Sequence, residues 1–220
     1  MANANPQLTD MILRVATALG GDLLKRTAFV GGVTTGLFVT DDFAREGVRF
    51  TDFHSGAPVC SPSRATFLTG RNHIRAGVYS VLSEQRHRMH LLRSETTLAE
   101  VVKEEGYGTA HFGKWHLGDE DAYQPGSRGF DRVFIHGGGG IGQSFPGSCG
   151  DAPGNKYFDP ALLHNGKFEK TQGFCTDVFC AQATRWSDGA RKGKPFFAYI
   201  TPNAPHGPML APEKNKKRWL

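Results

Sequence analysis

The sequence has little cysteine, and its few cysteines are far apart. There are four in 220 residues, at Cys60, Cys149, Cys175 and Cys180, too few and too scattered for a disulfide framework. The spacing of Cys175 and Cys180 also falls outside that of paired zinc ligands. A disulfide scaffold and a structural zinc site are therefore not expected, although a secreted chain could pair two of the last three cysteines.

Long apolar runs are also missing. No stretch approaches the length of a membrane-spanning helix, so we expect no membrane span. The apolar run that begins at Met11 is interrupted by Asp22, Lys25 and Arg26, so the N-terminus is not a clear signal peptide. The residues themselves leave localisation open.

The net charge of +5 comes with two local concentrations of basic residues. Neither zinc-finger spacing nor an RNA-recognition signature accompanies them, so we expect no nucleic-acid partner. A small anionic substrate explains the first group, and the second is most simply a solvated end. The first group is Arg64, Arg71, Arg75, Arg86, Arg88 and Arg93 with three histidines, and the second is Lys214, Lys216, Lys217 and Arg218.

The alternation of elements predicts an α/β fold. Length, 39% hydrophobic residues and 28 glycines suit one loop-rich α/β domain. We expect a mostly parallel sheet sandwiched between helices. The expected helices are 1–26, 97–105 (with a Thr97–Glu100 capping box) and 176–191; the expected strands are 27–40, 48–54, 107–112, 132–135 and 194–201; segment 151–170 is expected to be loop with a turn at Asn165-Gly166.

Residues 60–71 place one sulfur, several hydroxyls and two guanidinium groups within a dozen positions. Ser61 suits an N-cap and Pro62 the first helical position, and Gly70 can end the helix. Cys60 would then lie just before a helix N-terminus, where backbone N–H groups favour an anion, and Arg64 could point to the same spot. Taken alone, Cys60 would be better interpreted as a buried structural cysteine.

Two later stretches carry further candidates for an anion site. Lys114 and His116 are separated by one residue in a segment expected to be extended, so both could face one way while Trp115 packs on the other side. His206 follows the most apolar predicted strand between prolines that stiffen the backbone. His136 ends another predicted strand, before a glycine-rich loop that lacks the ending of a P-loop, and is a further candidate for substrate contact.

These stretches resemble the signatures of the sulfatase family. The first matches Cys-x-Pro-Ser-Arg followed by Leu-Thr-Gly-Arg, the second runs from Gly106 to Gly118, and the third is an Asn-x-Pro-His-x-Pro loop at Asn203. The resemblance covers roughly residues 37 to 213 and implies the alkaline-phosphatase-like fold. It divides the chain into an extension of unclear role, 1–26, and a partial catalytic domain, 27–220. It also implies a secreted, periplasmic or lysosomal location.

The resemblance implies hydrolysis of sulfate esters and a role for each matching residue. A maturation enzyme would oxidise Cys60 to formylglycine, whose hydrate attacks sulfur. Lys114 would draw charge from the sulfate oxygens, and Arg64 would steady the hydrate. His206 would protonate the leaving oxygen, and His116 would help remove a proton to regenerate the aldehyde.

Asp41 and Asp42 end the predicted strand 27–40 and have two interpretations. They resemble the Asp pair that holds a divalent cation in sulfatases, with formylglycine at Cys60 as a further ligand. Ca²⁺ is then favoured over Mg²⁺. Alternatively they are ordinary acids at a helix start, because the segment that follows them resembles one lying further downstream in the family.

The chain also departs from the family pattern after His206. The later Asp-Asn metal pair, the second site lysine and the C-terminal subdomain have no counterpart in the 220 residues. We therefore expect a fragment with little activity, and the alternative is an incomplete domain that binds sulfated ligands without turnover. A cysteine phosphatase is disfavoured because its Cys-x5-Arg spacing would need arginine where Thr66 stands. The expected ligand is a sulfated small molecule or carbohydrate.

Overall fold

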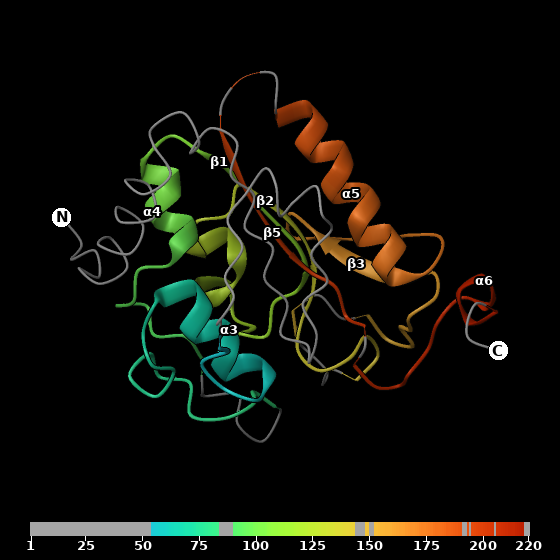
Figure 1. Ribbon diagram of the computed structural model, residues 1–220, viewed down its shortest axis with the longest axis horizontal. Coiled ribbons are helices and arrows are strands. Elements are labelled where there is room, and N and C mark those ends of the chain that lie inside the picture. The colour runs from blue at the N-terminus through green and yellow to red at the C-terminus, as the bar shows by residue number, and fades with distance from the viewer. Residues whose placement is uncertain are drawn as a thin grey trace.

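A mixed five-stranded sheet organises the described part of the chain (Figure 1). The computed structural model describes residues 54–83, 90–143, 148–149, 152–190, 193, 195–204 and 206–217. The strand order is β4-β3-β2-β1-β5, with β1 parallel to β2 and β5, and β3 antiparallel to β2 and β4. The elements are α3 (Cys60–Thr69), α4 (Leu98–Glu104), β1 (Gly108–Lys114), η2 (Asp121–Tyr123), η3 (Pro125–Arg128), β2 (Arg132–His136), β3 (Ala161–His164), β4 (Lys167–Lys170), α5 (Cys175–Ala190), β5 (Phe196–Thr201) and α6 (Glu213–Lys216).

The predicted α/β class is confirmed, with one local correction. Segment 151–170, expected to be loop, contains the hairpin β3–β4, and its antiparallel strands make the sheet mixed. The predicted turn is present: Asn165 and Gly166 have φ values of 47° and 83°, as a type I′ hairpin turn requires. All four residues of β4 are exposed, so the strand had no apolar alternation by which to predict it.

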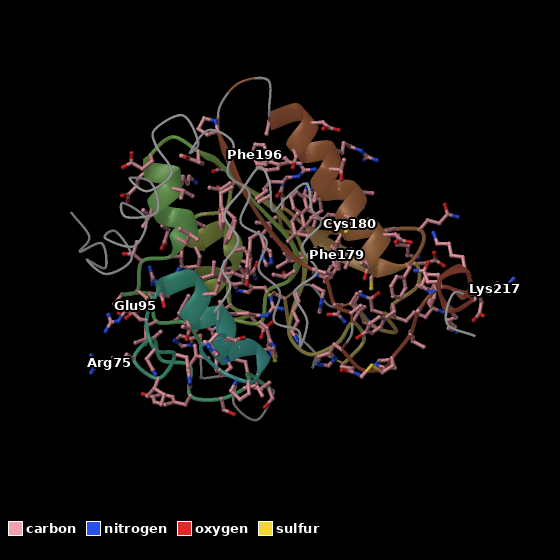
Figure 2. The ribbon with its side chains drawn as sticks, in the orientation of Figure 1. Arg75, Glu95, Phe179, Cys180, Phe196 and Lys217 are labelled. Carbon is pink, nitrogen blue, oxygen red and sulfur yellow. The ribbon has the colours of Figure 1, made fainter. Side chains whose placement is uncertain are left out.

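Helices cover both faces of this sheet. α3 and α4 lie over one face and α5 over the other (Figure 1). Figure 2 shows Glu95 near α3, and Phe179 and Cys180 on α5 at the opposite side. The core under α3 and α4 includes Ala65, Leu68, Leu98, Ala99, Val133, Ile135, Phe197 and Tyr199, and the core under α5 includes Ala110, Phe112, Phe134, Phe179 and Ala183.

β1 lies between β2 and β5, and all seven of its residues are buried. Near its carboxyl end it runs very close to β5 at Gly113. A Cβ atom on Gly113 would lie 2.1 Å from the Thr201 carbonyl oxygen, and the φ of 117° is one that other residues rarely adopt. Glycine at this position therefore allows the ends of β1 and β5 to meet.

The predicted capping box at the start of α4 is confirmed. The Thr97 hydroxyl oxygen accepts from the Glu100 N–H at 3.2 Å, and the Glu100 carboxylate accepts from the Thr97 N–H at 2.6 Å. The same hydroxyl donates to the Arg128 carbonyl at 2.9 Å. α4 is thereby tied to the segment that leads into β2.

Thr97→Ala is expected to lower the free energy of unfolding by about 1–2 kcal/mol, because it removes an N-cap and strands the Arg128 carbonyl. Urea unfolding followed by circular dichroism measures the change. Thr97→Ser keeps both hydrogen bonds and should stay within about 0.5 kcal/mol of wild type. Equal losses in the two variants would mean that the methyl group, not the cap, stabilises α4.

Several sequence predictions fall outside the described residues. These are the helix 1–26, the strand 27–40, Asp41, Asp42 and nearly all of the strand 48–54. Among the described helices, none is long and apolar enough to cross a membrane. All four cysteines are free thiols.

Candidate active site

The first turn of α3 positions Cys60. The helix begins at Cys60 itself, with Val59 as N-cap and no side chain bonded to the helix start, so the predicted boundary was slightly late. Ser61, predicted as the N-cap, instead accepts a hydrogen bond from the Leu82 N–H at 3.2 Å. The half-buried Cys60 therefore lies at a helix start that carries no competing cap, which suits an anionic group.

Arg64 connects α3 to the end of β1. Its guanidinium donates to the Lys114 carbonyl at 2.6 Å, and its side chain is 7% exposed. Its Nε has no hydrogen-bond partner among the described residues. Arg64 thus brings a buried positive charge to the carboxyl end of the sheet, one helical turn from Cys60.

Lys114 is the last residue of β1 and is 2% exposed. Burial and, less strongly, the neighbouring Arg64 charge lower its pKa, while the charge of Cys60 and a hydrogen bond to it oppose the shift; the resulting pKa is about 8. The same contact places the Lys114 ammonium against Cys60. No carboxylate in the described ranges forms an ion pair with Lys114 or Arg64.

His116 lies beside these groups, but not in the extended conformation we predicted. Its φ is 61°, in the left-handed region, and its Nε2 is 2.8 Å from the Leu82 carbonyl oxygen. Space for the ring comes from Gly138, where a Cβ would lie 2.6 Å from the imidazole Cδ2. Trp115 is fully buried and packs away from the site, as expected.

The proton arrangement of His116 follows from these contacts. A carbonyl can only accept, so Nε2 carries the hydrogen, and Nδ1, which has no partner among the described residues, presents a lone pair. Burial, with the nearby charges of Lys114, Arg64 and His206, lowers the pKa of His116 to about 3. His116 is therefore neutral at neutral pH.

His206 follows β5 and completes the group. Its ring is exposed, its Nδ1 is 2.8 Å from the Gly207 carbonyl oxygen, and its charge acts on His116. The chain thus brings together five of the predicted site residues at the carboxyl end of the sheet. They are Cys60, Arg64, Lys114, His116 and His206.

Asn203 and Tyr157 also contact this region, and we did not predict a role for either. Asn203 is 3% exposed and donates to the Tyr157 hydroxyl at 2.6 Å. Asn203 belongs to the same proline-bounded motif as His206, so its position could have drawn notice. Tyr157 comes from a segment before β3 that carried no signal of a site.

Of the three predicted cation ligands, only Cys60 lies among the described residues. In the part of the chain that the structure describes, no three His, Cys, Asp or Glu side chains gather as a metal site. Asp41 and Asp42, the predicted ligands, lie outside that part. The described residues alone do not form a complete cation site, so no catalytic step is derived through one.

Comparison with known proteins finds a matching family and individual relatives. The sequence model of the sulfatase family matches residues 27–218. Arylsulfatase G of Mus musculus is 50% identical over 120 residues, which cover 53% of this chain and 21% of that protein.

Solved structures of other proteins also align with the fold of this chain. The crystal structure of Ps i-CgsB aligns with a TM-score of 0.65 and 28% identity, over 74% of this chain and 38% of that one. BT4656 in complex with its substrate D-glucosamine-2-N,6-O-disulfate aligns with a TM-score of 0.57 and 29% identity, over 76% of this chain and 29% of that one. The chain therefore spans well under half the length of these proteins.

Proposed function

This chain belongs to the sulfatase family, and from that premise we propose that it contributes the nucleophile and the anion-binding groups for hydrolysis of a sulfate ester. Residues 27–220 would form this part of the catalytic domain, with 1–26 as an extension. The observation that supports the proposal most directly is the Lys114 ammonium against Cys60 at an uncapped helix start, beside the buried Arg64. Buried cations without described counter-ions favour a bound anion.

The proposed substrate is a sulfated carbohydrate or a sulfated small molecule. BT4656, which aligns with this chain at 29% identity, was solved with a disulfated glucosamine. A sulfate monoester is negatively charged, and its tetrahedral oxygens could accept charge-assisted hydrogen bonds from Lys114 and Arg64. No nucleic-acid partner is proposed.

The family implies a formylglycine and a divalent cation. Formylglycine made from Cys60 by a maturation enzyme would supply the attacking hydroxyl. Lys114 would neutralise charge that develops on the sulfate oxygens, while Arg64 holds the end of β1 in place through the Lys114 carbonyl. We assign the cation to Asp41, Asp42 and modified Cys60, with Ca²⁺ favoured by an oxygen ligand set.

The two histidines have complementary proposed roles. His206 is exposed and would give a proton to the leaving oxygen. The neutral His116, with the lone pair of Nδ1 free, would accept a proton from the remaining hydroxyl. An anion bound among these cations would raise the low pKa of His116 and make it a stronger base.

The mass of the Cys60 peptide tests the proposal. When the chain is produced together with a formylglycine-generating enzyme, the peptide should lose about 18 Da relative to its cysteine form. The peptide with the exposed Cys180 is the internal control and should keep its thiol mass. Aryl sulfate turnover with added Ca²⁺, lost in Cys60→Ala, completes the test.

The outcomes separate the candidate functions. Conversion of Cys60 with turnover supports a sulfatase. Conversion with sulfate binding but no turnover supports the incomplete domain that only binds sulfated ligands. A plain thiol under all conditions, together with no turnover, contradicts the proposed hydrolysis.

A further inference from the structure

Tyr157 holds the loop that carries His206. Its side chain is 1% exposed, and its hydroxyl lies 3.1 Å from the His206 carbonyl oxygen and 2.9 Å from that of Gly207. One hydroxyl hydrogen is available, so the two carbonyls share it. The hydroxyl oxygen also accepts from Asn203 Nδ2 at 2.6 Å. A buried phenol thus joins three points of one short loop.

The glycine-rich loop after β2 holds the same segment from another side. Gln143 Nε2 donates to the Gly207 carbonyl at 3.0 Å, and Gln143 Oε1 accepts from the Gly140 N–H at 3.0 Å. Within the segment, the His206 N–H donates to the Asn203 carbonyl at 2.9 Å. The backbone around His206 is therefore held at several points, although the imidazole itself is exposed.

Asn203 connects this arrangement to the cationic site. Its side chain lies beside His136, the fully buried last residue of β2, although neither imidazole nitrogen nor Asn203 Oδ1 has a partner of good geometry among the described residues. The charges of Lys114 and Arg64 also act on His136. Buried polar atoms with unmet capacity mark a place for water or ligand, here beside Lys114.

We propose that Tyr157 and Asn203 are positioning residues for the His206 loop, holding His206 in place against the site of Cys60, Lys114 and His116. The proposal rests on the proposed sulfate-ester hydrolysis, in which His206 protonates the leaving oxygen. Among the described residues, the Tyr157 hydroxyl bonds only to the carbonyls of His206 and Gly207 and to Asn203, so it acts through the His206 loop and not on the substrate. Misplacement of a catalytic group by about 1 Å can cost on the order of 100-fold in rate.

Tyr157→Phe tests the proposal, because it removes the hydroxyl and keeps the ring that packs on Phe174. With the formylglycine form and an aryl sulfate as probe, kcat should fall at least about tenfold while KM changes less than about twofold. Tyr79→Phe makes the same chemical change on an exposed ring and should leave both constants unchanged.

Asn203→Ala gives a second, independent measurement. It should reproduce the loss in kcat, and the double variant should lose no more than the worse single variant, since both residues act through one unit. A purely structural effect would instead appear as a matching loss of the fraction folded, which urea unfolding reports. A kcat within about twofold of wild type in Tyr157→Phe overturns the proposal.

A second readout does not need turnover. Inorganic sulfate should shift the His206 imidazole carbon resonances in wild type and in Tyr79→Phe, and the shift should be several-fold smaller in Tyr157→Phe. Equal shifts in all three proteins, or none in the folded wild type, overturn the positioning role. An unmodified Cys60 with no turnover contradicts the proposed hydrolysis alone, and the sulfate shift still decides the role of Tyr157.

Discussion

Replacing Lys114 with methionine is expected to weaken sulfate binding strongly and, at the same time, to stabilise the fold. The ammonium is 2% exposed, lies against Cys60 and has the Arg64 charge nearby. Lys114 and a bound sulfate would form a buried charge pair. Removing the ammonium should therefore weaken sulfate binding by about 2–5 kcal/mol, or at least about 30-fold. The proposed turnover should fall by on the order of 100- to 1,000-fold.

The gain in stability follows from the lowered pKa. The pKa of Lys114 falls from 10.5 to about 8 on folding, so at neutral pH the folded chain holds a proton that burial disfavours. A tenfold change in proton affinity corresponds to about 1.4 kcal/mol, so Lys114→Met could raise the free energy of unfolding by up to about 3 kcal/mol. The cost of burying the charged Lys114 is complete below its pKa in the folded chain and disappears as the pH rises through its pKa in the unfolded chain. The stability gained in Lys114→Met should therefore vanish in strong alkali.

Titration calorimetry with inorganic sulfate and urea unfolding measure the two effects. Lys103→Met is the matched control: Lys103 is half-exposed and pairs with Asp131 at 2.6 Å, so its loss should change stability by less than about 1 kcal/mol and leave sulfate binding intact. A Lys114→Met protein that is less stable than wild type, with unchanged sulfate affinity, would show Lys114 to be a structural residue. A Lys114→Met protein that is more stable than wild type but binds sulfate less tightly would indicate that Lys114 serves function at a cost in folding stability.

The candidate site could be predicted because its residues occupy the ends of elements. Lys114 ends β1, His206 follows β5, and Cys60 starts α3. In an α/β sheet, the carboxyl ends of parallel strands share one edge, so residues far apart in sequence must meet there. The β1 and β5 strands are parallel neighbours, and that pairing alone brings Lys114 and the His206 loop together.

The features that escaped prediction depend on contacts between distant segments. His116 adopts its left-handed conformation where the Leu82 carbonyl and the space at Gly138 receive the ring, and neither is visible in the local sequence. Tyr157 acts on His206 across 49 residues. β4 carries only exposed side chains, and its place in the sheet comes from its hairpin turn. Hydrophobic periodicity and sequence motifs do not reveal contacts between segments that are far apart in the sequence.

Mild acid should destabilise the fold strongly. His111, His116 and His136 are all buried, and burial lowers the pKa of each below the usual 6.5, to about 3 for His116. The charges that face them are also positive: Arg64 beside His111, with Lys114 joining Arg64 beside the other two, and His206 beside His116. Within the described ranges, no carboxylate opposes the shifts of these three pKa values.

The sign of the effect follows from which state takes up protons. Below pH 6.5 the unfolded chain protonates these histidines while the folded chain does not, so stability is complete above 6.5 and is lost as the pH falls. Each histidine lowers the free energy of unfolding by about 1.4 kcal/mol per pH unit, so the three together lower it by about 4 kcal/mol in the first unit below pH 6.5. Typical domains are stable by only about 5–15 kcal/mol, so the chain should approach unfolding near about pH 5.

Urea unfolding at several pH values between neutrality and this limit measures the slope. His111→Gln can keep the contact with the Thr201 hydroxyl, 3.0 Å from Nε2, while it removes the titrating group, and it should reduce the slope by about a third. His164→Gln is the control, because His164 is only partly buried and pairs with Glu169 at 2.6 Å; the steep loss of stability below pH 6.5 should persist in this variant. A flat profile in the wild type would mean that these histidines titrate normally when folded, and would therefore contradict their burial among the cations of the site.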